Sequence, residues 1–469
     1  MNAFEGFMEF RKEKDYLGER DVPADAYWGI HTLRARENFF LSGRPVNPRL
    51  IKAYALVKKA CCQANRETGY LAQEKADAIA AACDEVSQGR WADQFPVDAL
   101  QGGAGTSTNM NVNEVIANRA IEILGGVKGD YRLIHPIEDV NLHQSTNDTY
   151  PTAIKVAAIA AVRDAARAIE ILQGIFQHKE KEFAGVVTTG RTEMQDAVPM
   201  TLGAAFSAFA DALSRDRWRT FKCEERLRVV NLGGTAVGTG LGAPRRYIFL
   251  VIEKLREVTG MGLSRGENLV DQTANADSFV EVSGILKAHA ATMMKIANDL
   301  RLLNMLGEIA LPPVQAGSSL MPGKINPVIA EACLHGAMQV MANDTLVASC
   351  AGNGTLQINE FLPLLADALL GSCELTVNMS VLMAPCVAGI TANTETARRY
   401  MDESPAIITA FLPYIGYERA GELLKLFTAA PRQSLREFLE HKLGREMVDR
   451  TLSPARLTAL GYDDNTSKK

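Results

Sequence analysis

Residues 317–327 read GSSLMPGKINP. Two glycines and two prolines enclose two serines, a lysine and an asparagine, a mixture that is unusual for a plain surface loop. Glycine permits backbone angles that other residues avoid, and proline suits the first turn of a helix. We therefore expect a flexible loop that ends where a helix begins, carrying two hydroxyl groups, an amide and one cation.

Three common motifs do not describe this chain. The loop is not a phosphate-binding P-loop, because five residues separate Gly317 from Gly323 where that motif has four, and Ile325 replaces the Ser or Thr that binds magnesium. The stretch GTGLGA at 238–243 resembles a dinucleotide fingerprint, but no βαβ unit is expected around it, which favours a turn. No GxSxG elbow is present, so an acyl-transfer serine is not indicated.

Three further polar loops resemble the first one in composition. They read GGAGTSTN (102–109), HQSTNDTYP (143–151) and GRTEMQDAVP (190–199), and each precedes a predicted helix, beginning at Val112, Pro151 and after Pro199. Helix capping alone explains any single loop of this kind. Four of them favour a shared anion site, because helix N-termini present free N–H groups and the positive end of the helix dipole.

The rest of the chain has apolar residues at helical spacing. This spacing predicts a helix that ends at Gly125-Gly126 and long helices over 151–176, 277–303, 328–350 and 357–384. Several are apolar nearly all round, which indicates burial in a large bundle or against other subunits, with a large helical monomer as the alternative. Short strands or a hairpin are expected at 22–29, and a polar tail at 463–469.

Composition excludes several classes of function. The chain has 469 residues and a net charge of −5, with no basic stripe, which argues against nucleic-acid binding. The first residues lack the apolar core of a signal peptide, and no unbroken apolar run reaches the roughly 18 residues that span a bilayer, so a cytoplasmic protein is expected. Eight cysteines without CxxC spacing and seven histidines without HxxxH spacing predict buried free thiols and no metal site.

The loop GSSLMPGKINP is similar to the signature GSSxMPxKxNP of the aspartase/fumarase superfamily. Resemblance extends over nearly the whole chain and is stronger to aspartate ammonia-lyases than to fumarases, in DVPADAYWGIHTLRARENF (21–39), DQFPVDALQGGAGTSTNMNVNEV (93–115), QSTNDTYPT (144–152), GRTEMQDAVPMTLG (190–203) and GITAN (389–393). It implies an all-α fold with three domains: a mainly helical domain at 1–144, a long-helix bundle at 145–388 and a small helical domain at 389–469. The bundle would be shared in a homotetramer, with each active site built from three subunits and no metal or other cofactor.

The resemblance also implies a reaction and a set of roles. The reaction is reversible anti-elimination of ammonia from L-aspartate to give fumarate, through an aci-carboxylate intermediate. Ser318 would be the catalytic base, with its pKa lowered by backbone N–H groups and by the Lys324 charge. The substrate-binding residues implied are Gly105, Thr106, Ser145, Thr146, Asn147, Thr192, Glu193, Lys324 and Asn326.

Four features depart from the family pattern. Glu193 stands where relatives carry His or Gln, so it is expected to contact the substrate ammonium or a larger cationic group, or else to pair with a protein cation at the pocket rim. His143 is either a rim contact or a structural residue. The segment 301–312, RLLNMLGEIALP, keeps GEI but lacks several residues before it, and PVIAEACLH at 327–335 differs from the usual aspartase pattern.

Alternative functions follow from these departures. The first is a lyase for a different amino acid or for an N-substituted aspartate. Fumarate hydratase is less favoured, because the His tied to water activation is absent at Glu193. An inactive structural homologue, like the crystallins of the superfamily, is disfavoured because the full set of implied site residues is present.

Overall fold

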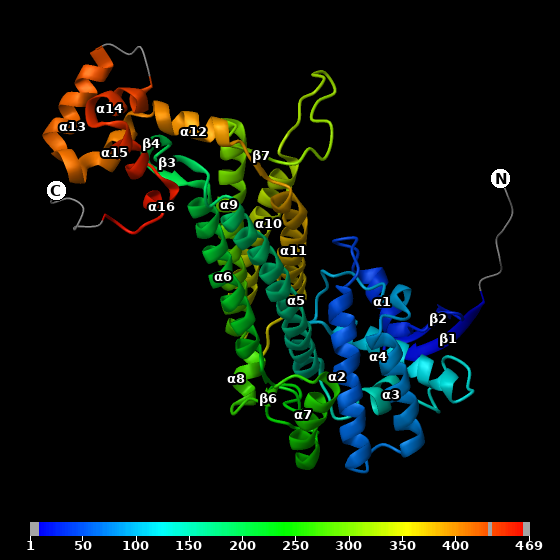
Figure 1. Cartoon of the computed structure of the whole chain (residues 1–469). Helices are drawn as coiled ribbons and strands as arrows, with labels where there is room; N and C mark the ends of the chain where they lie inside the picture. Colours follow the sequence, from blue (N-terminus) through cyan, green and yellow to red (C-terminus); the bar gives the residue numbers. More distant parts are fainter. Residues whose placement is uncertain (1–8, 430–433, 463–469) are drawn as a thin grey trace. The chain divides into compact units, whose positions relative to one another are not determined.

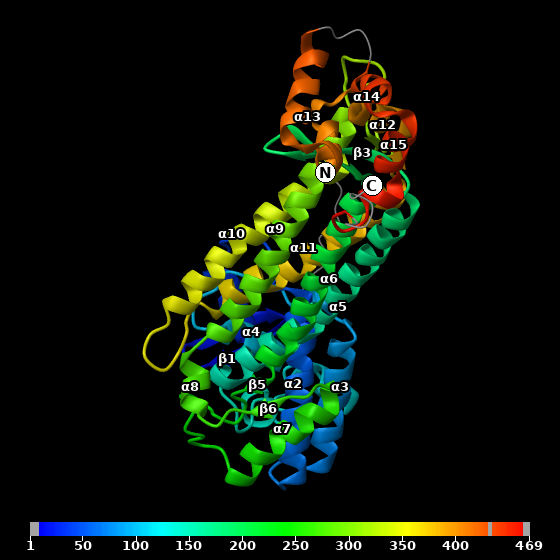
Figure 2. The ribbon, with the colours of Figure 1, turned by 60° about the vertical axis from the view of Figure 1, so that its left-hand side comes forward.

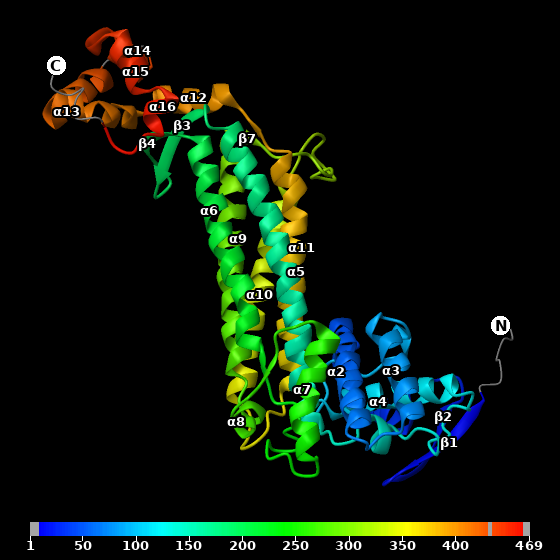
Figure 3. The ribbon, with the colours of Figure 1, turned by 60° about the horizontal axis from the view of Figure 1, so that its bottom comes forward.

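The computed structural model describes residues 9–429 and 434–462 and confirms an all-α fold with a few short strands (Figure 1). Five long helices dominate the described residues: α5 Thr146–Glu182, α6 Leu202–Leu227, α9 Asp277–Leu306, α10 Val328–Gly352 and α11 Leu362–Ala388. Their segments run alongside one another in all three views (Figures 1 to 3). The helices predicted at 277–303 and 328–350 are thereby confirmed, whereas the one predicted at 357–384 begins later, at Leu362.

The chain divides into two compact units, each built from separate stretches of sequence. The first unit takes the residues up to 166 together with 219–288 and 339–376, and the second takes 167–218, 289–338 and the residues from 377 onward. Each of the five long helices therefore contributes one part to each unit. The division into domains at 1–144, 145–388 and 389–469 stays a prediction.

The first unit carries most of the shorter N-terminal elements. They are β1 Phe10–Asp15, β2 Gly18–Pro23, α1 Ile30–Asn38, α2 Pro48–Glu67, α3 Gln73–Ser87, α4 Thr106–Ile123, β5 Val229–Val230, α7 Arg245–Thr259, β6 Ser264–Arg265 and α8 Leu269–Ala274. Helix α2 packs against both α3 and α7, and α3 packs against α4. Helix α4 ends at Ile123, as the glycine pair after it predicts.

The expected hairpin at 22–29 is displaced in the structure. Strands β1 and β2 pair antiparallel over residues 10–23, with Phe10 opposite Pro23 and Asp15 opposite Gly18. The sequence signal is weak because charged residues occupy five of six positions in β1 and three of six in β2, so no apolar alternation marks the strands.

The second unit carries a hairpin and the C-terminal helices. Its further elements are β3 Val187–Thr192, β4 Gln195–Thr201, β7 Ile309–Ala310, β8 Thr391–Ala392, α12 Thr394–Glu403, α13 Leu412–Ala429, α14 Leu435–Leu443, α15 Arg445–Thr451 and α16 Pro454–Leu457. A separate apolar core forms among the C-terminal helices around Met401, Phe411, Leu423, Leu439 and Val448. The predicted polar tail at 463–469 lies outside the described residues.

Helix α11 is long and apolar enough to cross a membrane, judged by length and composition alone. Half of its most apolar window is buried inside the protein, and the core helix of a bundle passes the same test. The eight cysteines all lie within the described residues, where each is buried and none forms a disulfide. The prediction of buried free thiols is confirmed.

Candidate active site

The ten predicted site residues fall into two groups of five, one in each compact unit. The first group lies at the starts of α4 and α5: Gly105, Thr106, Ser145, Thr146 and Asn147. The second group lies on the β3–β4 hairpin and on the loop before α10: Thr192, Glu193, Ser318, Lys324 and Asn326.

Gly105 precedes α4 in a conformation that only glycine accommodates here. Its φ of 90° lies in the left-handed region, and a Cβ atom would stand 2.3 Å from the ring of Tyr150. Helix α4 begins at the next residue, exposed Thr106, whose hydroxyl donates to the carbonyl oxygen of Gly103 at 2.8 Å. The helix therefore starts six residues before the predicted Val112, and the hydroxyl-rich segment forms its first turn.

The start of α5 is tied to α4 by a buried asparagine. The Nδ2 of Asn109 donates to the hydroxyl of Thr146 at 3.1 Å and to Oδ1 of Asn141 at 3.1 Å. The backbone N–H of Asn147 donates to the hydroxyl of Ser145 at 3.2 Å. These bonds hold the two helix starts together, so the structure unites the first group of predicted residues.

Pro151 lies inside α5 rather than in its first turn, because the helix begins at Thr146. A proline has no N–H, which leaves the carbonyl four residues earlier, that of Asn147, without its helical partner. Asn231 supplies the missing donor, with its Nδ2 at 3.0 Å from that carbonyl oxygen. The side chain of Asn147 in turn donates to the carbonyl oxygen of Ala236 at 2.7 Å.

Asp148 holds the start of α5 in place through backbone hydrogen bonds. This fully buried carboxylate accepts backbone N–H bonds from Ser145 at 3.0 Å, Gly233 at 3.1 Å and Thr235 at 3.0 Å. Burial raises the pKa of Asp148 to about 7, and the three N–H groups oppose that rise. Asp148 thereby fixes the α5 start and the segment 231–236 relative to each other.

A buried lysine stands next to this cluster. The ammonium of Lys58 donates to Oδ1 of Asn141 and to Oε1 of Gln144, both at 2.8 Å. Burial lowers the pKa of Lys58 to about 8. Because Asn141 also accepts from Asn109, one chain of contacts leads from the lysine to the hydroxyl of Thr146.

The segment 190–199 is a strand hairpin and not the predicted loop before a helix. Strand β3 ends at Thr192, which pairs with Gln195, and α6 begins only at Leu202. The two turn residues, Glu193 and Met194, have φ values of 52° and 61°. Such a turn prefers Asn-Gly, so the strained Glu-Met pair indicates a functional constraint.

Both predicted residues of the hairpin, Thr192 and Glu193, are exposed. Within the described residues of one chain Glu193 forms no ion pair. The alternative in which Glu193 pairs with a cation of the same chain therefore finds no partner in the part of the chain that is described. Its carboxylate is free to face a ligand or a second subunit.

A buried ion pair holds strand β3 in place. The carboxylate of Glu308, which has no exposed surface, accepts from Arg191 at 2.9 and 3.1 Å and from the hydroxyl of Thr188 at 2.7 Å. Arg191 also lies 3.3 Å from Asp196 on the opposite strand. Glu308 belongs to the GEI segment that the chain shares with its family, and its role as the anchor of the hairpin was not predicted.

Two hydrogen bonds join the two ends of the loop 317–327. The backbone N–H of Gly317 donates to the carbonyl oxygen of Lys324 at 2.8 Å, and the Nδ2 of Asn326 donates to the carbonyl oxygen of Gly317 at 2.8 Å. The hydroxyl oxygen of Ser318 accepts N–H bonds from Leu320 at 3.1 Å and Met321 at 2.9 Å. Helix α10 begins at Val328, as predicted.

The hairpin and the loop project from the same end of the helices but on different sides (Figures 1 and 3). Within one copy of the second unit the β3–β4 hairpin therefore lies apart from the loop before α10. His143 is held by structural contacts: its Nδ1 lies 2.6 Å from Oδ1 of Asn65, and its ring contacts Tyr70. Among the described residues no group of three or more His, Cys, Asp or Glu is placed to hold a metal ion.

Five residues that hold the predicted site residues in place were not predicted from the sequence: Lys58, Asn109, Asp148, Asn231 and Glu308. Asp148 had one available signal, its place directly after the STN stretch of the second loop. The others act across large separations in sequence and are recognisable only once the fold is known.

Comparison with known proteins agrees with these findings. A family described as Lyase matches residues 18–342. The aspartate ammonia-lyase of Pseudomonas aeruginosa is 46% identical over 442 residues, which cover 92% of this chain and 93% of that protein. The aspartate ammonia-lyase of Bacillus subtilis is 43% identical over 97% of this chain and 98% of its own length.

Solved structures give the same assignment. A fumarate lyase:delta crystallin from Brucella melitensis bound to cobalt superimposes with a TM-score of 0.93 at 46% identity, covering 96% of this chain and 100% of that one. A class II fumarase from Schistosoma mansoni superimposes with a TM-score of 0.88 at 31% identity, over 95% and 98% of the two chains. The chain therefore belongs to the lyase family of the aspartase/fumarase superfamily and is a carbon–nitrogen lyase.

Proposed function

We propose that this lyase catalyses the reversible anti-elimination of ammonia from L-aspartate to give fumarate. The observations that support the proposal are a hydroxyl-rich pair of helix starts at Thr106 and Ser145–Asn147 in the first unit and, in the second unit, a GSS loop whose Ser318 oxygen accepts two backbone N–H groups. The identity of 43–46% to aspartate ammonia-lyases over more than 90% of the chain supports the same substrate.

The helix starts supply donors for a developing charge. Removing the C3 proton of aspartate is feasible only if the negative charge spreads onto the adjacent carboxylate as an aci-carboxylate. Preorganised hydroxyl and N–H donors at that group are then the main source of catalysis. Thr106, Ser145, Thr146 and Thr192 are assigned this role, with Asn147 holding the substrate and Gly105 allowing its close approach.

Ser318 is assigned the role of base. As an alkoxide, Ser318 takes the C3 proton of the substrate, and the electron pair of the broken C–H bond moves onto the adjacent carboxylate. That electron pair then returns to form the C2–C3 double bond, while the C–N bond breaks and ammonia leaves. The two N–H groups of Leu320 and Met321 favour the alkoxide over the neutral hydroxyl. The Lys324 charge on the same loop acts in the same direction, and no metal or cofactor is needed for this sequence of steps.

Lys324 and Asn326 are assigned to the second substrate carboxylate. In the described state the Nδ2 of Asn326 is bonded to Gly317, so the loop must rearrange when substrate arrives. The glycines at 317 and 323 are the natural hinges, because Gly323 has a φ of 80° and a Cβ on Gly317 would stand 2.6 Å from the carbonyl oxygen of Lys324. We infer that the loop closes as a lid and excludes water.

A complete site is assigned to a homotetramer in which three subunits contribute. The separation of the hairpin from the loop within one copy of the second unit supports this assembly. Mixing two inactive variants, Ser318→Ala and Thr146→Val, should restore part of the activity, because some shared sites then contain neither substitution. Absence of any recovery after subunit exchange would argue that each subunit holds its own site.

Glu193 is assigned to the substrate ammonium. Its carboxylate lies on a strained, exposed turn next to Thr192. Glu193→Gln should raise KM for the amine substrate more than it lowers kcat. Unchanged kinetics in this variant would remove Glu193 from the site. If the substrate group that contacts Glu193 is a larger cation than ammonium, the substrate is instead an N-substituted aspartate.

The deciding experiment follows the ultraviolet absorbance of fumarate during incubation with L-aspartate, alongside a panel of related amines and N-substituted aspartates. Rapid fumarate formation from L-aspartate supports the proposal, whereas ammonia release from another amine alone would replace the substrate. Hydration of fumarate without ammonia would indicate a fumarase, and no activity on any substrate would indicate a structural homologue. The eight unpaired buried thiols support a cytoplasmic location.

A further inference from the structure

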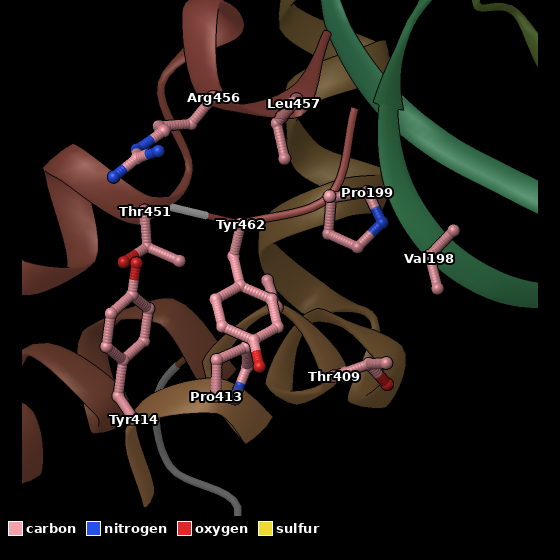
Figure 4. Close-up of a pocket in the computed structure, with 11 residues that line it drawn as sticks. Val198, Pro199, Thr409, Pro413, Tyr414, Thr451, Arg456, Leu457 and Tyr462 are labelled. Carbon is pink, nitrogen blue, oxygen red and sulfur yellow. The ribbon is translucent and has the colours of Figure 1, made fainter. Parts of the chain in front are cut away.

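Two cavities that none of the ten predicted site residues lines differ in the charge that they offer to a ligand. The cavity in Figure 4 lies between strand β4, through Val198 and Pro199, and the C-terminal helices. Arg456 is the one charged side chain among its described lining residues, and it already has an interaction partner. The second cavity lies in the first unit, has a volume of about 630 Å³ and is lined in part by Glu360. The carboxylate of Glu360 makes this second cavity the candidate for binding a charged molecule.

The second cavity lies beside the start of α4. Gly102 and Gly103 form part of its wall, and the hydroxyl of Thr106, the first residue of α4, donates to the carbonyl oxygen of Gly103 at 2.8 Å. A volume of about 630 Å³ lies within the range of roughly 300–1,000 Å³ that small-molecule pockets span. Three aromatic side chains, which follow α1 or precede α11, complete this part of the wall: Phe39, Phe40 and Phe361. The cavity is therefore large enough for an organic ligand and has aromatic surface to hold it.

One carboxylate oxygen of Glu360 has no partner. Its Oε1 accepts a hydrogen bond from the hydroxyl of Thr355, whereas its buried Oε2 accepts no hydrogen bond within residues 9–429 and 434–462. The bond from Thr355 lowers the pKa of Glu360, so this carboxyl group is ionised at neutral pH. Among the described residues Glu360 forms no ion pair, and no lysine, arginine or histidine lines the cavity. Because a charge away from water needs an opposite charge or hydrogen-bond donors, a cation in the cavity would supply the missing partner.

The rest of the lining favours an organic cation over a metal ion. Calcium binds about six to eight oxygen ligands, and magnesium also prefers a shell of oxygen atoms. Besides the carboxylate, the cavity wall holds the side chain of Gln101, whose Oε1 already accepts two hydrogen bonds from Thr108, at 2.9 and 3.0 Å. The rings of Phe39, Phe40 and Phe361 instead offer apolar surface and aromatic faces, which attract ammonium groups. The lining therefore suits a flat apolar body that carries one ammonium group.

We propose that the cavity beside α4 binds a small aromatic ammonium ion as an effector. The ammonium group would donate to Oε2 of Glu360, and the apolar body would lie against the phenylalanine rings. Because Gly102 and Gly103 belong to the wall, the bound ion would restrain the segment that leads into α4 at Thr106. Binding itself does not depend on the proposed lyase reaction, so its failure leaves that reaction untouched.

The test titrates the full-length protein with benzylammonium chloride by calorimetry. Saturable binding to one site per chain is expected, and benzyl alcohol, which has the same ring without the charge, should bind much more weakly. Glu360→Gln keeps the size of the side chain but removes its charge, so it should weaken benzylammonium binding by about tenfold, equal to about 1.4 kcal/mol. The matched control is Glu267→Gln, because Glu267 is an exposed carboxylate of the same unit that does not line the cavity.

A second pair of measurements locates the bound cation. Glu193→Gln should leave benzylammonium binding unchanged, and benzylammonium should slow amide hydrogen exchange in residues 100–109. Loss of binding in Glu193→Gln would place the cation in the lyase site instead and overturn the proposal. Absence of saturable binding, or equal binding by Glu360→Gln and Glu267→Gln, would overturn it as well. If benzylammonium does not bind and Glu360→Gln dissociates an oligomer in light scattering, Glu360 pairs with a cation of a second subunit and the proposal is wrong.

Discussion

Replacing Glu308 by Gln tests whether the buried ion pair holds the β3–β4 hairpin in place. The substitution keeps the size of the side chain but removes its charge, and it turns one acceptor oxygen into an NH₂ group facing the guanidinium of Arg191. The native carboxylate accepts two bonds from that guanidinium and one from Thr188, and it has no exposed surface.

The magnitude follows from these contacts. Removing one partner of a buried ion pair typically costs 3–5 kcal/mol. Arg191 remains 19% exposed and keeps Asp196 at 3.3 Å, so the low end of that range applies, about 3 kcal/mol. At 1.4 kcal/mol for each factor of ten, the hairpin should open about 100-fold more often.

Hydrogen exchange followed by mass spectrometry measures that opening directly. Amides in residues 187–201 should exchange about 100-fold faster in Glu308→Gln, and kcat should fall because Thr192 ends the loosened strand. Glu267→Gln, which changes an exposed carboxylate, is the matched control and should leave both quantities unchanged. If the hairpin of Glu308→Gln exchanges at the wild-type rate, the ion pair does not anchor it.

Three further substitutions test other parts of the structure. Gly105→Ala should abolish activity and lower the thermal midpoint, because the added Cβ would stand 2.3 Å from the Tyr150 ring at a φ of 90°; a fully active variant would contradict this. Asp148→Asn should lower kcat by about tenfold or more, because an amide cannot accept all three N–H bonds that order Ser145 and the segment 231–236; wild-type kcat would contradict this. Glu114 is fully buried, and burial raises its pKa from 4.5 to about 7, so the native state loses stability as the pH rises through that window. Glu114→Gln removes this dependence. Between about pH 4.5 and pH 7 the thermal midpoint of the wild type should therefore fall more than that of the variant, by the equivalent of roughly 3 kcal/mol. Parallel pH profiles of the two proteins would contradict this.

The long helices were accessible from sequence because their apolar spacing is a local property. Helix α9 at 277–306 matches its prediction closely, since its periodic residues are themselves the buried ones. The late start of α11 has a local cause: residues 355 and 358 form a bridge, and Oδ1 of Asn359 accepts the N–H of Phe361. Apolar periodicity does not register such a turn.

The β3–β4 hairpin was missed for a different reason. Strand β3, VTTGRT, is largely polar, and β4, QDAVPMT, contains a proline. The turn is Glu193-Met194 instead of the glycine- or asparagine-containing pair that marks such turns. Its main anchor, Glu308, lies more than a hundred residues away in sequence. Strand pairing and long-range ion pairs depend on the fold, so neither leaves a local signal.

The predicted site residues came from resemblance to a family, whereas their supports came from the structure. Hydroxyl-rich helix starts alone indicate an anion site and no particular reaction. The contacts of Asp148, Asn231 and Lys58 join segments that are distant in sequence, and they explain why the helix starts at Thr106 and Thr146 hold their positions. The sequence indicates the candidate donors but not the framework that orients them.

The proposed reaction is the elimination of ammonia from L-aspartate with Ser318 as base. The most direct test is proton NMR of L-aspartate incubated with the wild type and with Ser318→Ala, together with an ammonia assay. We expect fumarate and ammonia in equal amounts from the wild type, and a rate at least about a hundredfold lower from Ser318→Ala. Absence of fumarate from the wild type, or an undiminished rate in Ser318→Ala, would contradict it.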